Sequence, residues 1–224
     1  MLILTIETCT DYCTLGLVRD GAVLAEAAFP GRYTLAQRML SRLDWLLREC
    51  ELSKTDIQAV AVSLGPGSFT GVRIGAAAAK TLAQWRQIPL LGISTLEALA
   101  YPFRHCRQVL LAPLINARRA QVYLALFDSE NGTLQRKSAD LVLSAEPLNA
   151  LLREHQGNYS HTLLIGMTEG LPEAFQCQFT GIVAPVRSLV TPHALAALAQ
   201  ARLDNGEQDD AMTLAPIYLR NAAD

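Results

Sequence analysis

The chain has 224 residues, enough for one domain or two small lobes, and at this length folding buries roughly 70% of the unfolded surface. Half of the residues are hydrophobic and only 18% are charged, so we expect a partner to cover some apolar surface, with a large core as the alternative. A formal net charge of −2 argues against strong nucleic-acid binding by this chain alone, while a local basic patch stays open.

The first part of the chain is predicted to contain three strands, a helix, a strand, a second helix and a short strand. Asp20-Gly21 is a hairpin signal between apolar runs, so the three opening strands should form a meander. Apolar residues at helical spacing predict an amphipathic helix soon after Pro30-Gly31. The predicted strands are 2–6, 12–18, 23–29, 57–64 and 90–93, and the predicted helices are 34–50 and 72–85.

The same element order returns in the second part of the chain. Asn131-Gly132 is again a turn signal, and Pro192 stands at the first turn of a helix rich in Ala and Leu. Because the two parts share no visible similarity of residues, the repeat is a hypothesis about element order. The predicted strands are 109–115, 121–127, 134–143, 162–165 and 181–184, and the predicted helices are 147–154, 169–175 and 192–203.

A glycine-rich loop lies between the predicted strand 57–64 and the helix that follows it. Its glycines, at 65, 67 and 71, allow positive φ and close approach of another group, and the amides of the first helical turn have no internal acceptors. Such a loop can hold an anion or the backbone of a partner. A simple tight turn is the alternative.

The loop fits neither common phosphate-binding motif. Val72-Arg73 follows Gly71 where a Walker loop needs Lys and Ser or Thr, and Thr70 stands where a dinucleotide fingerprint needs its third glycine. We interpret Ser68 and Thr70 as hydroxyls that cap the helix, with anion contact as the lesser alternative. Arg73 is expected at the surface, facing solvent, a phosphate or an acidic partner.

The run Gly65-Pro66-Gly67-Ser68-Phe69-Thr70-Gly71, followed by Arg73-Ile74-Gly75, resembles the signature of the bacterial TsaB (YeaZ) family. That family is the dimerization subunit of the machinery that makes threonylcarbamoyladenosine in tRNA. Weaker agreement is found at Glu7-Thr8, at Ala117-Arg118-Arg119 and at Pro216-Ile217-Tyr218-Leu219-Arg220. The resemblance implies an α/β, two-lobed actin-like ATPase (ASKHA, RNase H-like) fold in which helices flank a mixed β-sheet in each lobe. We place the lobes at 1–98 and 99–224, because the stretch 94–107 is polar and contains proline.

In actin-like ATPases the first hairpin of each lobe grips the nucleotide phosphates, usually with an Asp and a bound metal. Here Glu7 with Thr8, and Asn116 with Arg118, stand at the corresponding positions. Asn116 carries no charge and therefore attracts Mg²⁺ weakly. The catalytic paralogue of the family, TsaD, also uses a His-x-x-x-His pair, and residues 33–39 contain no His. We therefore expect no metal, no cofactor and no catalytic residue, and a glycine loop that only resembles a phosphate loop.

Other common sites are not indicated. The five cysteines form no C-x-x-C pair and the four histidines show no i, i+4 pairing, so neither a disulfide framework nor a zinc site is expected. The loop is not a G-x-S-x-G nucleophile elbow. The chain opens directly on a strand and has no apolar run near the roughly 20 residues of a membrane span, so we expect a cytoplasmic protein.

The two helices of the first lobe carry the expected partner surface. Gly and Ala in the second helix let another helix approach closely, and packing against the chain's own helix 34–50 is the compatible alternative. The resemblance implies that these helices bind either a second copy or the catalytic TsaD subunit. The expected interface residues are Leu35, Met39, Leu43, Ile74, Ala76, Ala77, Ala78 and Leu82.

The leading hypothesis is a non-catalytic scaffold. It would dimerize when alone, bind a TsaD-like enzyme with a TsaE-like ATPase as a further partner, and meet tRNA only through the complex. The resemblance implies that this complex transfers threonylcarbamoyl from threonylcarbamoyl-adenylate to N6 of adenosine 37. The alternative is an active ATP-dependent phosphotransferase of the actin-like superfamily. A metalloprotease is the least supported reading, since no metal triad is visible.

Overall fold

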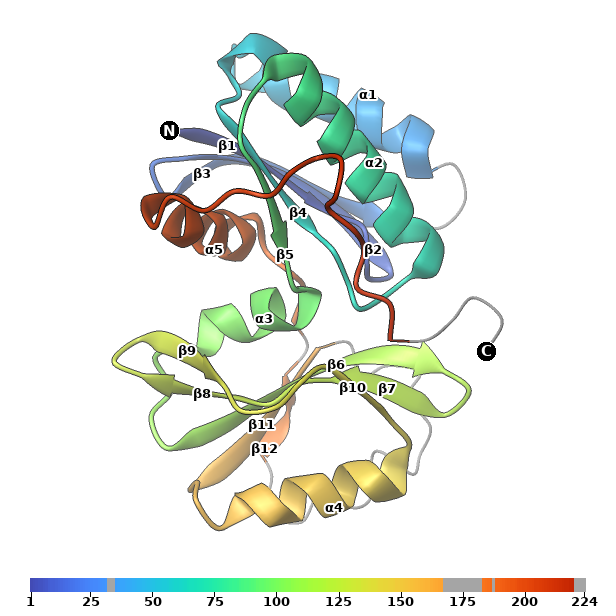
Figure 1. Ribbon diagram of the computed structural model, residues 1–224, viewed down its shortest axis with the longest axis vertical. Coiled ribbons are helices and arrows are strands. Elements are labelled where there is room, and N and C mark those ends of the chain that lie inside the picture. The colour runs from blue at the N-terminus through green and yellow to red at the C-terminus, as the bar shows by residue number, and fades with distance from the viewer. Residues whose placement is uncertain (32–34, 167–182, 187, 220–224) are drawn as a thin grey trace. The chain divides into compact units, whose positions relative to one another are not determined.

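The chain forms two compact units in the computed structural model, which describes residues 1–31, 35–166, 183–186 and 188–219 (Figure 1). The first unit consists of Met1–Ala98 together with the segment from Val190 onward, and the second unit consists of Leu99–Leu189. The sequence prediction assigned everything from residue 99 onward to one lobe. The structure differs because helix α5 (Pro192–Asp204) packs against the strands of the first unit.

The first unit is built on a five-stranded mixed sheet in the order β3-β2-β1-β4-β5. β1 pairs antiparallel with β2 and parallel with β4, and β4 pairs parallel with β5. The strands are β1 (Leu2–Glu7), β2 (Tyr12–Arg19), β3 (Ala22–Pro30), β4 (Ala59–Ser63) and β5 (Leu90–Ile93). The helices are α1 (Leu35–Glu49), α2 (Phe69–Arg86), the start of α3 (Thr95–Ala100) and α5, with a 3-10 turn at Lys54–Asp56.

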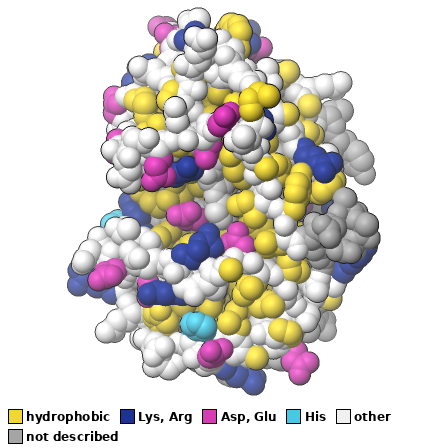
Figure 2. All heavy atoms as spheres, viewed as in Figure 1, with side chains coloured by type: hydrophobic (Ala, Val, Ile, Leu, Met, Phe, Trp, Pro, Cys, Tyr) yellow, Lys and Arg dark blue, Asp and Glu magenta, His cyan; other side chains and the backbone are white. Residues whose placement is uncertain are grey.

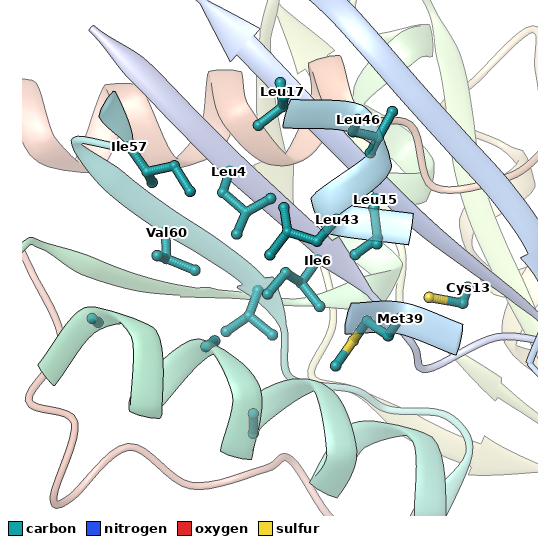
Figure 3. Close-up of a cluster of buried hydrophobic side chains, with 14 of the residues drawn as sticks. Leu4, Ile6, Cys13, Leu15, Leu17, Met39, Leu43, Leu46, Ile57 and Val60 are labelled. Atoms are coloured by element: carbon teal, nitrogen blue, oxygen red, sulfur yellow. The ribbon is translucent and has the colours of Figure 1, made fainter. Parts of the chain in front are cut away.

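Helices cover both faces of this sheet, which explains why every residue of β1 is buried. Leu4 and Ile6 of β1 face α1 and α2, where they meet Leu43 and Leu46 of α1 (Figure 3). Side chains alternate along a strand, so Thr5 faces the other side, toward α5. The main core therefore lies between the sheet and the helices α1 and α2.

The second unit repeats this order, with the sheet β10-β7-β6-β11-β12 and an added hairpin, β8 and β9, on β6. β6 pairs antiparallel with β7 and parallel with β11, as β1 does with β2 and β4. Its elements are β6 (Val109–Arg118), β7 (Gln121–Leu124), β8 (Phe127–Glu130), β9 (Thr133–Arg136), β10 (Leu141–Leu143), α4 (Ala145–Gln156), β11 (His161–Gly166) and β12 (Val183–Val186), with a 3-10 turn at Tyr101–Phe103. The predicted repeat is confirmed for the strand order of the two sheets, with the hairpin β8–β9 added in the second unit, while the predicted helix 169–175 lies outside the described residues.

Most predicted elements match the structure, and the differences have local causes. α2 begins at Phe69, three residues before the predicted start, because Ser68 caps it. The predicted strands 121–127 and 134–143 are each divided, since Leu126 bonds to Lys137 and Ser138 between the strand pairs. The predicted helix 169–175 and the start of the strand 181–184 lie outside the described residues. Over the described ranges, no helix combines the length and apolar character needed to cross a membrane.

Candidate functional site

The turn between β1 and β2 is organised by Glu7, the last residue of β1. Its side chain is fully buried, and Oε1 accepts hydrogen bonds from the backbone N–H groups of Cys9 (2.7 Å) and Thr10 (2.8 Å). Burial raises the pKa of Glu7 above its usual value, outweighing these bonds and the nearby Ser63 hydroxyl. That hydroxyl donates to the carbonyl oxygen of Ile6 (3.4 Å), and Oε2 of Glu7 is buried without a hydrogen-bond partner among the described residues. Glu7 thus stabilises its own turn through hydrogen bonds to the backbone.

The glycine loop packs directly on this turn. A Cβ placed on Gly67 would overlap the carbonyl group of Cys9, and a Cβ on Gly71 would overlap the carbonyl oxygen of Thr8. The backbone N–H of Ser68 donates to the same Cys9 carbonyl (2.6 Å). The glycines are therefore needed for close approach of backbone, and that backbone belongs to the chain's own first hairpin.

The other loop residues have structural contacts as well. Gly65 and Pro66 are buried, and Gly65 exchanges two hydrogen bonds with Thr95, at 2.9 and 3.1 Å. Ser68 is the N-cap of α2, because its Oγ accepts from the backbone N–H of Gly71 (3.2 Å), as predicted. Thr70 is exposed in the first turn of α2 and makes no capping bond to a described residue.

Arg73 lies on the surface in contact with two aromatic rings. Its guanidinium carbon is 3.7 Å from the ring centroid of Phe69, and its Nε donates to the hydroxyl of Tyr218 (2.8 Å). The two rings also contact each other, with centroids 5.3 Å apart. Sequence reasoning left solvent, a phosphate and an acidic partner open for Arg73 and gave no sign of these aromatic contacts.

Tyr218 reaches α2 because the C-terminal segment runs back along the first unit, seen as the red trace beside α2 in Figure 1. The segment starts at Asp209, whose backbone N–H donates to Leu90 O (2.8 Å) and whose carboxylate accepts from the N–H of Gly92 (2.7 Å). Further on, the N–H of Ile217 donates to Leu64 O (2.7 Å). The segment pairs residues that are 145 positions apart, Arg73 with Tyr218, and no local sequence pattern signals such a contact.

In the second unit, Asn116 lies near the end of β6, in the topological position that Glu7 has in β1. Asn116 is exposed, whereas Glu7 is buried, and its Oδ1 accepts from the backbone N–H of Arg118 (2.8 Å). The turn that follows holds Arg118, Arg119 and Ala120 at φ of +62°, +49° and +54°, all in the left-handed region. Within the described ranges, no three His, Cys, Asp or Glu side chains group as ligands of a metal.

Half of the predicted interface residues face inward. Leu35, Met39, Leu43 and Ala76 are buried in the core of the first unit. The helical periodicity that selected the first three marks the face that packs on the sheet, and the small side chain that selected Ala76 lets α2 lie close to the sheet. The remaining four lie nearer the surface. They are the exposed Ala77 and the half-buried Ile74, Ala78 and Leu82.

Comparison with known proteins places the chain in a family. A family model described as TsaD, tRNA N6-adenosine threonylcarbamoyltransferase, matches residues 34–218. A protein of Escherichia coli named tRNA threonylcarbamoyladenosine biosynthesis protein TsaB is 36% identical over 162 residues, which make up 71% of this chain and 69% of that protein. The chain belongs to the TsaB family. The TsaB protein of Bacillus subtilis is 38% identical over 140 residues, 62% of this chain, and the match spans 61% of that relative's length.

The TsaB assignment extends to the fold. The solved structure of YeaZ from Pseudomonas aeruginosa is 26% identical, covers 97% of this chain and 99% of its own, and superposes with a TM-score of 0.78. Solved structures of more distant proteins share the fold alone. Together they confirm the predicted actin-like α/β class, with one mixed sheet in each unit.

Proposed function

We propose that this chain is a non-catalytic scaffold subunit in the biosynthesis of threonylcarbamoyladenosine in tRNA. Its relatives carry that pathway in their names, and the matching family model is described as the transferase itself. The chain binds and supports a TsaD-like catalytic subunit, which transfers threonylcarbamoyl to N6 of adenosine 37. A TsaE-like ATPase is a further partner, and the chain dimerizes with itself when alone. It acts in the cytoplasm, where its partners meet tRNA.

The observation that carries the non-catalytic role is the filled glycine loop. The carbonyl groups of Thr8 and Cys9 occupy the space next to Gly71 and Gly67, and the N–H of Ser68 is used by Cys9. A phosphate loop needs that space and those amides for its ligand. Glu7 stands at a position that would hold a metal in an ATPase, but its Oε1 accepts hydrogen bonds from the backbone of its own turn.

Nothing comparable favours the phosphotransferase alternative. One solved structure, Lmo2764 of Listeria monocytogenes, is described as a candidate N-acetylmannosamine kinase; it is 11% identical with a TM-score of 0.51, and so shares the fold only. On the face shown in Figure 2, basic side chains are interspersed with acidic ones. Within each unit, the described residues on that face show this mixture of charges, which agrees with contact to tRNA through the complex.

The test is reconstitution with purified subunits. Incubation of this chain alone with tRNA and the threonylcarbamoyl donor is expected to give no modified adenosine by mass spectrometry of nucleosides, and ATP with Mg²⁺ is expected to stay unhydrolysed. Addition of the TsaD-like and TsaE-like subunits from the same organism should give modified tRNA, and leaving out this chain should abolish it. Modification by this chain alone, or steady ATP turnover that Gly67→Arg removes, would overturn the proposal.

A further inference from the structure

The Arg73 side chain is held in one orientation at the surface of the first unit. The ring of Phe69 stacks on the guanidinium, and the hydroxyl of Tyr218 accepts from Nε. Phe69 is 37% exposed and Tyr218 is 43% exposed, so both rings also reach solvent. The long Arg side chain therefore loses little freedom when it binds a further group, because the rings have already ordered it.

The outer edge of this guanidinium is unused. Arg73 makes no ion pair with a described residue, and neither terminal Nη donates a hydrogen bond within the described part of the chain. Those two nitrogens present a planar fork of N–H groups, which matches the two oxygens of a carboxylate. The guanidinium of Arg73 can therefore bind an anionic group, and no described residue of this chain provides one.

We infer that Arg73, fixed by Phe69 and Tyr218, receives a carboxylate side chain of the protein partner. This inference rests on the proposed function, because the partner is the TsaD-like catalytic subunit. It adds the chemistry of the contact, and it assigns a role in the interface to the C-terminal segment, which supplies Tyr218. Arg73 is the contacting residue, and Tyr218 is a positioning residue that acts through it.

The surroundings of Arg73 favour a protein over an RNA phosphate. One face of α2 is exposed from Arg73 through Ala77 and Thr81 to Trp85, in steps of one helical turn. At its far end Trp85 is 63% exposed and Met212 of the C-terminal segment is 77% exposed. We call this surface the α2 ridge. Arg, Trp, Tyr and Met are enriched at protein interfaces, whereas an RNA site needs several cations. The neighbouring cation, Arg86, lies over the ring of Trp85 and already donates to the carbonyl oxygen of Thr55.

The first experiment measures the Kd of this chain for the TsaD-like subunit at 50 and 300 mM NaCl. Arg73→Gln should weaken binding by about tenfold or more at low salt and reduce its salt dependence. Arg73→Lys should be intermediate, since it keeps the charge and loses the fork. Tyr218→Phe should weaken binding by about two- to fivefold, because it frees the guanidinium to rotate. Arg19→Gln changes another exposed arginine, on β2, and is the control that should bind as wild type does.

The second experiment identifies the carboxylate. The amine introduced by Arg73→Lys is treated in the complex with a water-soluble carbodiimide, which joins an amine to a carboxylate in direct contact. Mass spectrometry should find an isopeptide bond between position 73 and one Asp or Glu of the TsaD-like subunit. Replacing that partner residue by Gln or Asn should weaken the wild-type complex as much as Arg73→Gln does.

Each outcome separates this inference from the proposed function. If wild type binds the partner and Arg73→Gln binds with the same Kd, the inference is wrong and the scaffold role stands. If Arg73→Gln lowers only the affinity of the assembled complex for tRNA, the occupant is a phosphate, and the inference is again wrong. A loss confined to self-association would make a second copy the occupant and also overturn it. If wild type does not bind the TsaD-like subunit at all, the proposed function fails, and the inference fails with it.

Discussion

The carbonyl oxygen of Thr8 takes the place that a side chain at residue 71 would need, and the carbonyl of Cys9 does the same at residue 67. Each glycine is required by a neighbour fixed in turn by Glu7, whose carboxylate holds the amides of Cys9 and Thr10. The loop, the turn and the buried acid therefore act as one unit. We expect a substitution in any of the three to displace the backbone at the start of α2.

Gly71→Ala tests this packing. We expect it to lower the free energy of unfolding of the first unit by roughly 1–3 kcal/mol, because the added methyl forces the backbone of Thr8 or α2 to move. Denaturant unfolding followed by tryptophan fluorescence measures it, since both tryptophans, Trp45 and Trp85, belong to this unit. Gly31→Ala is the control, because a Cβ there meets its nearest atom at an ordinary 3.5 Å. Equal stability of the two variants would contradict the prediction.

The alanine content of α2 has two separate explanations on its two faces. Ala76, Ala79 and Ala83 are buried, and their small size lets α2 lie close to β4 and the rest of the sheet. Ala77 is exposed on the α2 ridge, where its small side chain would leave room for the proposed partner. In the run of four alanines, Ala76 and Ala79 are buried, Ala77 is exposed and Ala78 is half-buried, so internal packing accounts for the two ends of the run.

Ala77→Glu should impair binding of the partner, whereas Ala79→Glu should impair folding. At Ala77 the charged side chain reaches water, so the protein should keep its thermal midpoint and lose binding to the TsaD-like subunit. At Ala79 it would bury an unpaired charge, which costs several kcal/mol and should unfold the first unit. Circular dichroism and light scattering measure the two properties. Ala201→Glu, on the exposed side of α5, is the control, and a folded Ala77→Glu that binds normally would place the interface elsewhere.

At the scale of the whole molecule, the chain builds most of one unit, then the second, and then returns to the first. α5 contacts β1, β2, β4 and β5, and the segment after it pairs with Leu90. The first unit is therefore discontinuous in sequence, whereas the second is one uninterrupted stretch. Each unit has its own buried cluster of apolar side chains.

A substitution in the core of one unit should speed hydrogen exchange in that unit and leave exchange in the other unit unchanged, measured on the full chain. Leu195→Ala in α5 removes a side chain that is 1% exposed, and it should cost roughly 2–5 kcal/mol and speed exchange in β1, β2 and β5. Leu148→Ala in α4, at 0% exposure, should instead speed exchange within residues 99–166. Faster exchange in residues 99–166 caused by Leu195→Ala would show that α5 supports the other unit.

Local patterns carried most of the fold and little of the site. Periodicity and turn signals predicted α1, β5 and α5 almost to the residue, because those signals act between near neighbours in sequence. Ser68 was identified as a cap for the same reason. The apolar stripe that includes Met39 marks the face of α1 that packs on the sheet, so its inward direction follows from local sequence. The contact of Arg73 with Tyr218 depends on the path of the segment after α5, which no local pattern predicts.

Gly16 of β2 contacts α5, which belongs to the C-terminal part of the first unit. A Cβ at that position would overlap Pro192 at the start of α5. The absence of a side chain at residue 16 of β2 is therefore required by a helix that is translated more than 170 residues later. While the polypeptide is being synthesised, the N-terminal sheet has one face without its covering helix and its β5 edge without Asp209. The second unit is complete in the nascent chain before either arrives. The first unit can therefore complete its contacts only after residues 190–209 have been synthesised, later than the last residue of the second unit.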